Sequence, residues 1–384
     1  MSWQSEPLSA LTLKIGSGST PRGGDSVYIS EGTTLIRSQN VYNNEFSTDG
    51  LVYIDEKTAE KMKGVSVEKE DVLVNITGDS VARCCLVHDA VLPARVNQHV
   101  AILRTNPKKL LPHFLAFYMV SPFMQAKMLS WAGTGGTRKA LTKGMLEGFE
   151  IPLPPVDVQD KIVQKIRTYN DLIENNRRRI QLLEESARLL YQEWFVHLRF
   201  PGHKQVKITD GVPEGWSKEP LENLLVLQRG FDLPVSKRIE GSVPIYASTG
   251  INGFHNVAKV KGPGVVTGRS GSLGTVMYVA KDYWPLNTTL WVKEFKKASP
   301  IFATYLLRAM KLEGYNGGAA VPTLNRNDVH KVDVLCPESK LMNEFEVQVE
   351  NIFKQIDKLK EYNEKLAQAR DLLLPKLMSG ELTV

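Results

Sequence analysis

Two long copies of one pattern constrain the fold more than any other feature of this sequence. Trp3-Gln-Ser-Glu-Pro-Leu-Ser-Ala-Leu11 recurs as Trp216-Ser-Lys-Glu-Pro-Leu-Glu-Asn-Leu224. Chance can explain one such match, but not a series of matches in the same order, and we therefore expect two copies of one module. The further matches are Thr77–Ser80 with Arg269–Ser272, Val96–Val100 with Leu286–Leu290, and Ile151–Pro154 with Val334–Pro337.

Each copy begins with short strands and loops and ends in a long helical pattern. Val72–Ile76 and Val265–Thr267 are rich in β-branched residues and are bounded by Gly, Asp and Ser, which is typical of strands. One helix is expected inside each copy, near Pro112–Met119 and near Pro300–Met310. A proline-marked boundary then precedes each long helix.

The two long helices carry apolar residues spaced alternately four and three apart. This spacing over four heptads is typical of a coiled coil. Pro375 is expected to kink or end the second helix. The expected seam consists of Ile166, Ile173, Asn176, Ile180 and Leu183 in the first helix and of Ile352, Ile356, Leu359, Asn363 and Leu366 in the second.

Two polar residues in the seam indicate how the helices pair. Parallel pairing in the register of the repeat sets Asn176 against Leu359, whereas antiparallel pairing sets Asn176 against Asn363. A buried amide without a partner costs about 1–3 kcal/mol, so facing amides are favoured. We therefore predict an antiparallel coiled coil with Asn176 near Asn363. The alternative is that both amides reach solvent at a loose point of the seam.

Composition and charge restrict the class of protein. The net charge of +6 and the isoelectric point near 9.0 favour a polyanionic partner. No apolar run approaches the roughly 20 residues of a membrane helix, and Met1–Glu6 lacks the pattern of a secretory signal. Three cysteines, two of them adjacent, form neither a disulfide framework nor a zinc pattern. A reducing cytoplasm is the expected location.

Several motifs together resemble the specificity (S) subunits of bacterial type I restriction–modification systems. The resemblance covers essentially the full length, in the order target-recognition domain, conserved helix, target-recognition domain, conserved helix. One departure is that Leu227–Phe231 lacks the Gly-x-Gly-x-Thr-Pro found in the first module. The matching motifs are Leu8–Pro21, Ile151–Pro155, Tyr191–Phe195, Phe200–Gly202, Gly211–Trp216 and Leu372–Glu381.

The resemblance implies an α+β fold with two α/β target-recognition domains, separated by two long helices that form an antiparallel coiled coil. It implies target-recognition domains at residues 1–155 and 201–337 and conserved spacer helices at 156–200 and 338–384. Each domain would read one half of a bipartite site in double-stranded DNA. The helices would set the spacing between the half-sites and dock methyltransferase (M) subunits, typically two.

The resemblance also implies that this chain is a non-catalytic DNA-recognition subunit. Restriction (R) subunits would join the complex of S and M subunits. S-adenosylmethionine, ATP and magnesium would be used by those partner subunits, so no cofactor or metal is expected in this chain.

Candidate DNA-binding residues follow from the chemistry of base recognition. Arg and Lys suit guanine, Asn and Gln suit adenine, and Ser and Thr suit either, while basic side chains also contact phosphates. The alternative for each segment is an ordinary polar turn. The candidates in the first module are Thr20, Arg22, Arg37, Ser38, Gln39, Asn40, Asn97 and Gln98, with Arg138 and Lys139 as a phosphate clamp.

The second module offers parallel candidates. Arg269 lies between Gly268 and Gly271, and it is our first choice for a guanine contact. The candidates in the second module are Arg229, Ser248, Thr249, Arg269, Ser270, Asn287, Thr288, Asn325 and Arg326.

Sequence motifs of catalysis do not occur in the chain. It has no Asn/Asp-Pro-Pro-Tyr/Phe tetrapeptide of the kind found in amino-methyltransferases and no Gly-x4-Gly-Lys-Ser/Thr phosphate loop. The seven histidines lack the spacing of metal ligands. Isolated acids such as Asp71 and Asp79 could still build a site together with distant residues.

Overall fold

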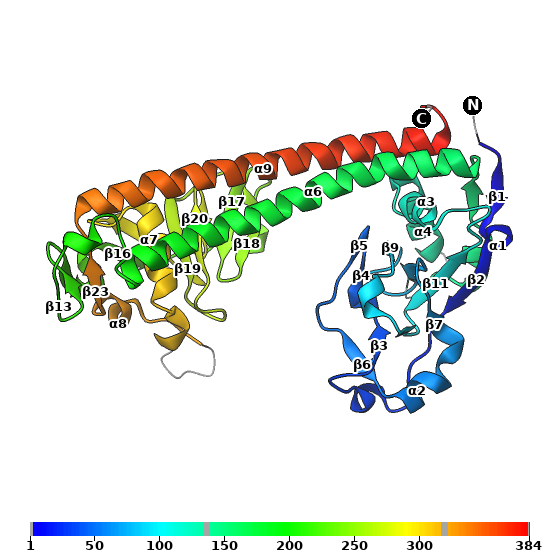
Figure 1. The fold of residues 1–384 in the computed structure, drawn as a ribbon, viewed down its shortest axis with the longest axis horizontal. Helices are drawn as coiled ribbons and strands as arrows, with labels where there is room; N and C mark the ends of the chain where they lie inside the picture. Colours follow the sequence, from blue (N-terminus) through cyan, green and yellow to red (C-terminus); the bar gives the residue numbers. More distant parts are fainter. Residues whose placement is uncertain (1–2, 134–138, 316–321, 383) are drawn as a thin grey trace. The chain divides into compact units, whose positions relative to one another are not determined.

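The computed structural model describes residues 3–133, 139–315, 322–382 and 384. The chain forms two compact units, Met1–Asn176 with Glu361–Val384 and Arg177–Lys360. The long helices α6 (Val156–Tyr191) and α9 (Ser339–Ser379) each contribute a segment to both units (Figure 1). Each unit has its own hydrophobic core.

The first unit is built on two four-stranded sheets. One has the order β2-β11-β8-β9, with every neighbouring pair antiparallel. The other has the order β6-β3-β10-β7, in which β10 is parallel to β3. The strands of these sheets are β2 (Thr12–Ser17), β3 (Thr33–Ile36), β6 (Val52–Ile54), β7 (Ser66–Val67), β8 (Val72–Asn75), β9 (Cys84–Leu86), β10 (Ala94–Val96) and β11 (Val100–Thr105).

Shorter pairs and helices complete the first unit. The strand pairs are β1 (Ser5–Pro7) with β12 (Glu150–Pro152) and β4 (Val41–Tyr42) with β5 (Glu45–Phe46). The helices besides α6 and α9 are α1 (Leu8–Leu11), α2 (Glu56–Lys61), α3 (Pro112–Met119), α4 (Pro122–Gly133) and α5 (Lys143–Glu147).

Strand β8 shows why the apolar run of the first module is almost uninterrupted. Alternate residues of a strand point to opposite faces of its sheet. Val72 and Val74 belong to the core cluster that includes Phe114 of α3, whereas Leu73 belongs to a separate cluster with Ile36. Because both faces of the strand are covered, every residue of β8 is buried.

The second unit repeats this strand order, which confirms the predicted duplication. Its sheets are β16-β22-β19-β20 and β18-β17-β21, in which β17 is parallel to β21. Strand pairs β15–β23 and β13–β14 and the helices α7 and α8 complete it. The elements are β13 (Ile208–Thr209), β14 (Val212–Pro213), β15 (Ser217–Pro220), β16 (Leu225–Arg229), β17 (Val243–Ala247), β18 (Gly250–His255), β19 (Gly264–Gly268), β20 (Val276–Val279), β21 (Trp284–Pro285), β22 (Thr289–Phe295), β23 (Asp333–Cys336), α7 (Pro300–Ala309) and α8 (Arg326–His330).

Hydrogen bonds between the strands correct the residue alignment of the two copies. The backbone N–H of Gly18 donates to Val100 O at 2.9 Å, and that of Gly230 donates to Thr289 O at 3.0 Å. Val100 and Thr289, which begin the equivalent strands β11 and β22, are therefore equivalent residues. The sequence matches of Val96–Val100 with Leu286–Leu290, and of Thr77 and Gly78 with Arg269 and Ser270, are therefore displaced by one residue. The corrected pairs are Gln98 with Asn287, His99 with Thr288, Thr77 with Ser270, and Gly78 with Gly271.

Helices α6 and α9 are antiparallel in each unit, as predicted. In the first unit, Asn176 Nδ2 donates to Asn363 Oδ1 at 2.9 Å, and Arg370 donates to Asn170 Oδ1 at 2.8 Å. In the second unit, Phe345 of α9 packs against Tyr191 at the end of α6. Asn176 is only 9% exposed, so the alternative in which the amides are solvated is wrong. The predicted pairing of Asn176 with Asn363 is confirmed.

The ends of the long helices differ from the sequence prediction in one respect. Helix α9 does not end at Pro375 but continues to Ser379. Proline removes one backbone hydrogen bond, and the burial of Leu377 and Met378 in the core of the first unit offsets that loss. None of the helices in the described ranges is both long enough and apolar enough to cross a membrane.

Candidate functional site

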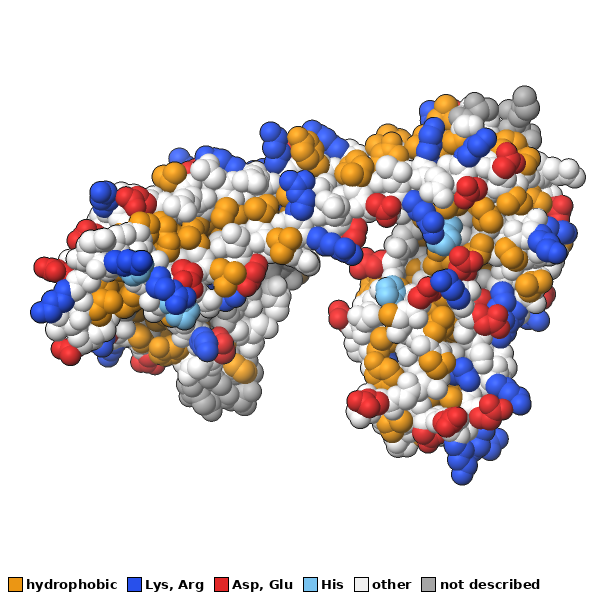
Figure 2. Space-filling model, in the orientation of Figure 1, with side chains coloured by type: hydrophobic (Ala, Val, Ile, Leu, Met, Phe, Trp, Pro, Cys, Tyr) orange, Lys and Arg blue, Asp and Glu red, His pale blue; other side chains and the backbone are white. Residues whose placement is uncertain are grey.

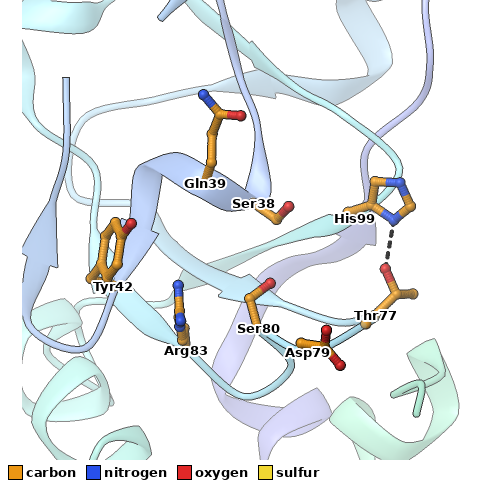
Figure 3. Close-up of a pocket in the computed structure, with 9 residues that line it drawn as sticks. Ser38, Gln39, Tyr42, Thr77, Asp79, Ser80, Arg83 and His99 are labelled. Carbon is orange, nitrogen blue, oxygen red and sulfur yellow. Dashed lines mark hydrogen bonds between the residues drawn. The ribbon is translucent and has the colours of Figure 1, made fainter. Parts of the chain in front are cut away.

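A cavity of about 430 Å³ in the first unit collects polar side chains from three loops (Figure 3). One loop follows β3, one connects β8 to β9, and one precedes β11. In the close-up, Arg83 lies beside Tyr42, and Asp79 and Ser80 lie on the loop after β8. The lining residues are Ser38, Gln39, Tyr42, Thr77, Gly78, Asp79, Ser80, Arg83 and His99.

The loop that carries most of the lining is pinned at both ends. Asn75 N–H donates to Arg83 O at 2.8 Å, and Ala82 N–H donates back to Asn75 O at 2.8 Å. Between these anchors Gly78 has a φ of +76°, a conformation that glycine adopts without strain. The loop is thus fixed at its base, and its tip presents Asp79 and Ser80.

A network of hydrogen bonds links this cavity to two of the predicted segments. Thr20 donates to the side-chain oxygen of Gln98, and Gln98 Nε2 lies 2.8 Å from His99 Nε2. The other ring nitrogen of His99 lies 2.5 Å from Thr77 Oγ1. Gly78 N–H donates to Lys139 O at 3.1 Å. The structure therefore brings together predicted residues that lie far apart in the sequence.

Sequence reasoning missed several lining residues. Arg83 was not predicted, although its guanidinium carbon lies 4.7 Å above the ring centre of Tyr42, a geometry that favours a cation. His99 and Thr77 were missed as well. The only available signal was their position beside predicted segments, because no periodicity marks residues in loops.

Two predicted residues of the first unit are buried and form hydrogen bonds within their own loops. Asn40 is fully buried, and its amide donates to Ser47 O at 3.0 Å and Asp49 O at 3.1 Å. Asn97 is 9% exposed, and its side-chain oxygen accepts from His99 N–H at 3.1 Å. Both amides stabilise their own loops, and their contact with DNA stays a prediction.

The other predicted residues of the first unit differ in their exposure and in the hydrogen bonds that their side chains already form. Arg37 is half-buried and donates to Gly50 O at 2.7 Å, so its guanidinium is already engaged. Ser38 is half-buried and lines the cavity. Arg138 lies outside the described residues. The exposed candidates are Thr20, Arg22, Gln39, Gln98 and Lys139.

The second unit places Arg269 at the end of β19, beside the segment that precedes β22. Its Nη1 lies 3.4 Å from Asn287 O, and the residue is half-buried. Asn287 donates to Asp232, which repeats the bond between Gln98 and Thr20 at equivalent positions. A side-chain hydrogen bond is therefore present at the same place in both units, just before β11 and just before β22.

The remaining candidates of the second unit separate into structural and exposed residues. Ser248 is only 9% exposed, and a contact of its hydroxyl with DNA stays a prediction. The side chain of Asn325 caps α8 by accepting from Asn327 N–H at 3.1 Å. Half-buried candidates are Ser270 and Thr288, and exposed ones are Arg229, Thr249 and Arg326.

The loop between β8 and β9 of the first unit is one residue longer than the equivalent loop between β19 and β20 of the second. In the second unit, Gly268 N–H donates to Thr275 O at 3.2 Å, which matches the bond from Asn75 to Arg83. Gly271 has a φ of +85°, like Gly78. The first unit has one residue more between these anchors, and it follows the shared glycine. Asp79 and Ser80 precede Val81 in the first unit, whereas Ser272 alone precedes Leu273 in the second, so the second loop has no acid at this place.

Surface charge alone does not locate a binding face. On the face drawn in Figure 2, acidic and basic side chains alternate over the first unit instead of gathering in one patch. Asp71 is not part of a surface site, because it is buried and pairs with Arg104 at 2.8 Å. The bond to Asp71 raises the pKa of Arg104. Among the described residues there is no group of three or more His, Cys, Asp or Glu that could hold a metal ion.

Comparisons with known proteins agree with this geometry. Residues 14–185 match the model of the type I restriction modification DNA specificity domain. The MjaIX specificity subunit of Methanocaldococcus jannaschii is 24% identical over 296 residues, covering 70% of this chain and 68% of that protein. The HindI specificity subunit of Haemophilus influenzae is 20% identical, covering 91% and 94%. The solved S subunit from M. genitalium shares the fold, with a TM-score of 0.55 at 17% identity over 98% of this chain and 96% of that one.

Proposed function

We propose that this chain is a specificity subunit of a type I restriction–modification system, and that each of its two units reads one half of a bipartite DNA target. The chain itself supplies recognition and no catalysis. The observation that carries this proposal is the duplicated sheet with the same polar edge in both units. Thr20 with Gln98 and Asp232 with Asn287 mark this edge at equivalent positions.

The exposed candidates of the first unit divide by chemistry. Gln39 and Gln98 can read adenine, whereas Arg22 and Lys139 suit phosphates. In the second unit Arg269 is the proposed guanine contact. Its long bond of 3.4 Å to Asn287 O is easily exchanged for a base.

The long helices are the proposed spacer and docking site for partners. Two M subunits would dock on α6 and α9, and R subunits would join through the complex. S-adenosylmethionine, ATP and magnesium would serve those partners. The paired amides Asn176 and Asn363 support a fixed helix register, which a spacer of constant length requires. A cytoplasmic location is part of the proposal and fits three free, buried cysteines.

The experiment tests the chain together with its M subunits. Methylation of a DNA library with two variable half-sites is measured for the wild type and for Arg269→Ala. Arg326→Ala, which removes an exposed arginine of the same unit, is measured for comparison. We expect Arg269→Ala to relax one position of one half-site by about tenfold and to leave the other half-site unchanged. A loss that is uniform over all sequences would contradict a base contact by Arg269.

Two other functions have distinct outcomes. A self-sufficient DNA methyltransferase would consume S-adenosylmethionine without any partner. A pure scaffold would bind DNA with no sequence preference and little dependence on salt. Either result with the purified full-length chain would replace the proposed function.

A further inference from the structure

We propose that Asp79 selects cytosine at one position of the half-site read by the first unit, by accepting a hydrogen bond from the N4 amino group of that base. This inference rests on the proposed function and assigns a base class to one part of its site. Of the nine described residues that line the cavity, Asp79 is the only acid.

The carboxylate of Asp79 is available for a ligand. The residue is exposed at the tip of a loop whose base is pinned by the bonds between Asn75 and Arg83. Within the described chain no side chain or backbone group forms a hydrogen bond or ion pair with this carboxylate. The fold therefore holds the position of Asp79 without using its charge.

DNA phosphates repel a carboxylate, so an acid at a DNA-binding edge weakens binding unless it accepts a hydrogen bond from a base. A carboxylate only accepts hydrogen bonds, so in the major groove it matches the amino groups of cytosine and adenine. In adenine the acceptor N7 lies beside the amino group and would repel the second carboxylate oxygen. Cytosine has no acceptor beside N4 on that edge, and it is therefore the base that Asp79 fits.

The cation in the same cavity complements this assignment. Arg83 is held above Tyr42, and its guanidinium retains donors for a second partner. The guanine paired with cytosine presents the acceptors O6 and N7 in the major groove. An acid and an arginine lining one cavity thus match the two bases of a cytosine–guanine pair.

The second unit provides an internal comparison. Its loop has the uncharged Ser272 directly after Gly271, where the first unit has Asp79 after Gly78. Thr275 occupies the place of Arg83. The proposed cytosine contact is therefore specific to the first unit.

The test uses the full chain in complex with its M subunits. Asp79→Asn keeps the size and the loop geometry but removes the charge, and Glu56→Gln removes an exposed charge from α2, outside the cavity. Methylation rates are measured on DNA in which each position of the first half-site carries each of the four bases. Affinity for unrelated DNA is measured alongside.

We expect the wild type to favour cytosine at one position by about tenfold or more. Asp79→Asn should lose most of that preference at that position only. It should also bind unrelated DNA about two- to fivefold more tightly, because one repulsive charge is gone. A merely structural residue would not change both quantities in these opposite directions. Glu56→Gln should leave the base preference unchanged.

Three outcomes would overturn the inference: an unchanged base preference in Asp79→Asn, relaxation at a position that favours a base other than cytosine, or a loss of methylation that is equal for all sequences. These outcomes are distinct from failure of the proposed function. That function fails if the wild-type complex shows no preference in either half-site.

Discussion

The two units contain the same sheet, but the residues that pack at the start of one equivalent strand differ in kind. In the first unit, the buried Asp71 pairs with Arg104 at 2.8 Å. The residue equivalent to Asp71 in the second unit is Gly264, and a Cβ there would lie 2.3 Å from the hydroxyl oxygen of Tyr283. An ion pair in one copy and an aromatic ring in the other therefore support the same strand.

This difference shows which features the duplicated fold requires. The close approach of backbone at Gly18 and Gly230 is present in both copies, because no side chain fits there. Interior charges and rings exchange freely as long as the space is filled and each polar group has a partner. Backbone geometry is thus the shared feature, and side-chain chemistry is the variable one.

The largest effect is expected from breaking the ion pair. Arg104→Met leaves Asp71 buried without its cation, and the free energy of unfolding of the first unit should fall by about 3–5 kcal/mol. As a control, Lys293→Met changes an exposed side chain of β22, the strand equivalent to β11, and it should change the free energy of unfolding of the second unit by less than about 0.5 kcal/mol. Hydrogen exchange of the full chain resolves the two units. Equal losses in both would contradict the comparison.

The shared glycines should give the next largest effect, and it should be similar in both units. A Cβ on Gly18 would lie 2.1 Å from Val96 O, and one on Gly230 would lie 2.2 Å from Leu286 O. Each Gly→Ala change should destabilise its own unit by about 1–3 kcal/mol, because backbone atoms cannot move aside cheaply. Gly16→Ala is the control, since its Cβ would meet nothing within 4 Å. Denaturant unfolding measures all three variants.

The two long helices are copies of one element of the repeat, but they carry different residues at the same place of the seam. Asn176 occupies the place of Leu359 in the repeat, and its partner is Asn363. Asn176→Leu should cost about 1–2 kcal/mol, because Asn363 loses a buried partner. The double change with Asn363→Leu should recover much of that loss. A double-mutant cycle in which the two effects simply add would show that the amides do not interact.

The smallest difference concerns pH. In the second unit, Leu227 N–H donates to His330 Nε2 at 2.9 Å, and burial lowers the pKa of His330. A lowered histidine pKa gives stability that is complete above the usual value of about 6.5 and is lost as the pH falls below it. Glu147 ends the equivalent helix of the first unit and pairs with Lys143 on the surface. Thermal unfolding of His330→Gln between pH 7.5 and pH 5.5 should show a weaker pH dependence than the wild type.

The fold was largely predictable from the sequence because it rests on periodicity and repetition. The strands around Val72 and Val265, the helices that begin at Pro112 and Pro300, and the facing amides were all predicted from local patterns. Helix α9 continues past Pro375 because tertiary burial outweighs one missing hydrogen bond.

The site was less predictable because loops lack periodicity. Asn40 has the chemistry of a base contact, but it is buried and its amide is used within its own turn. Conversely, Arg83 has no distinguishing neighbours in the sequence and is recognised only by its place above Tyr42. The alignment error of one residue arose because the backbone hydrogen bonds that fix the equivalent residues leave no trace in local composition.

The facing amides of α6 and α9 also restrict how such a chain can change during evolution. A gene alteration that lengthens only one of the two helices would move Asn176 away from Asn363, and each amide would lose its partner. Viable length variants should therefore arise as matched insertions in both halves of the gene, each a whole number of heptads. Drift in helix length would then proceed in steps and not one codon at a time.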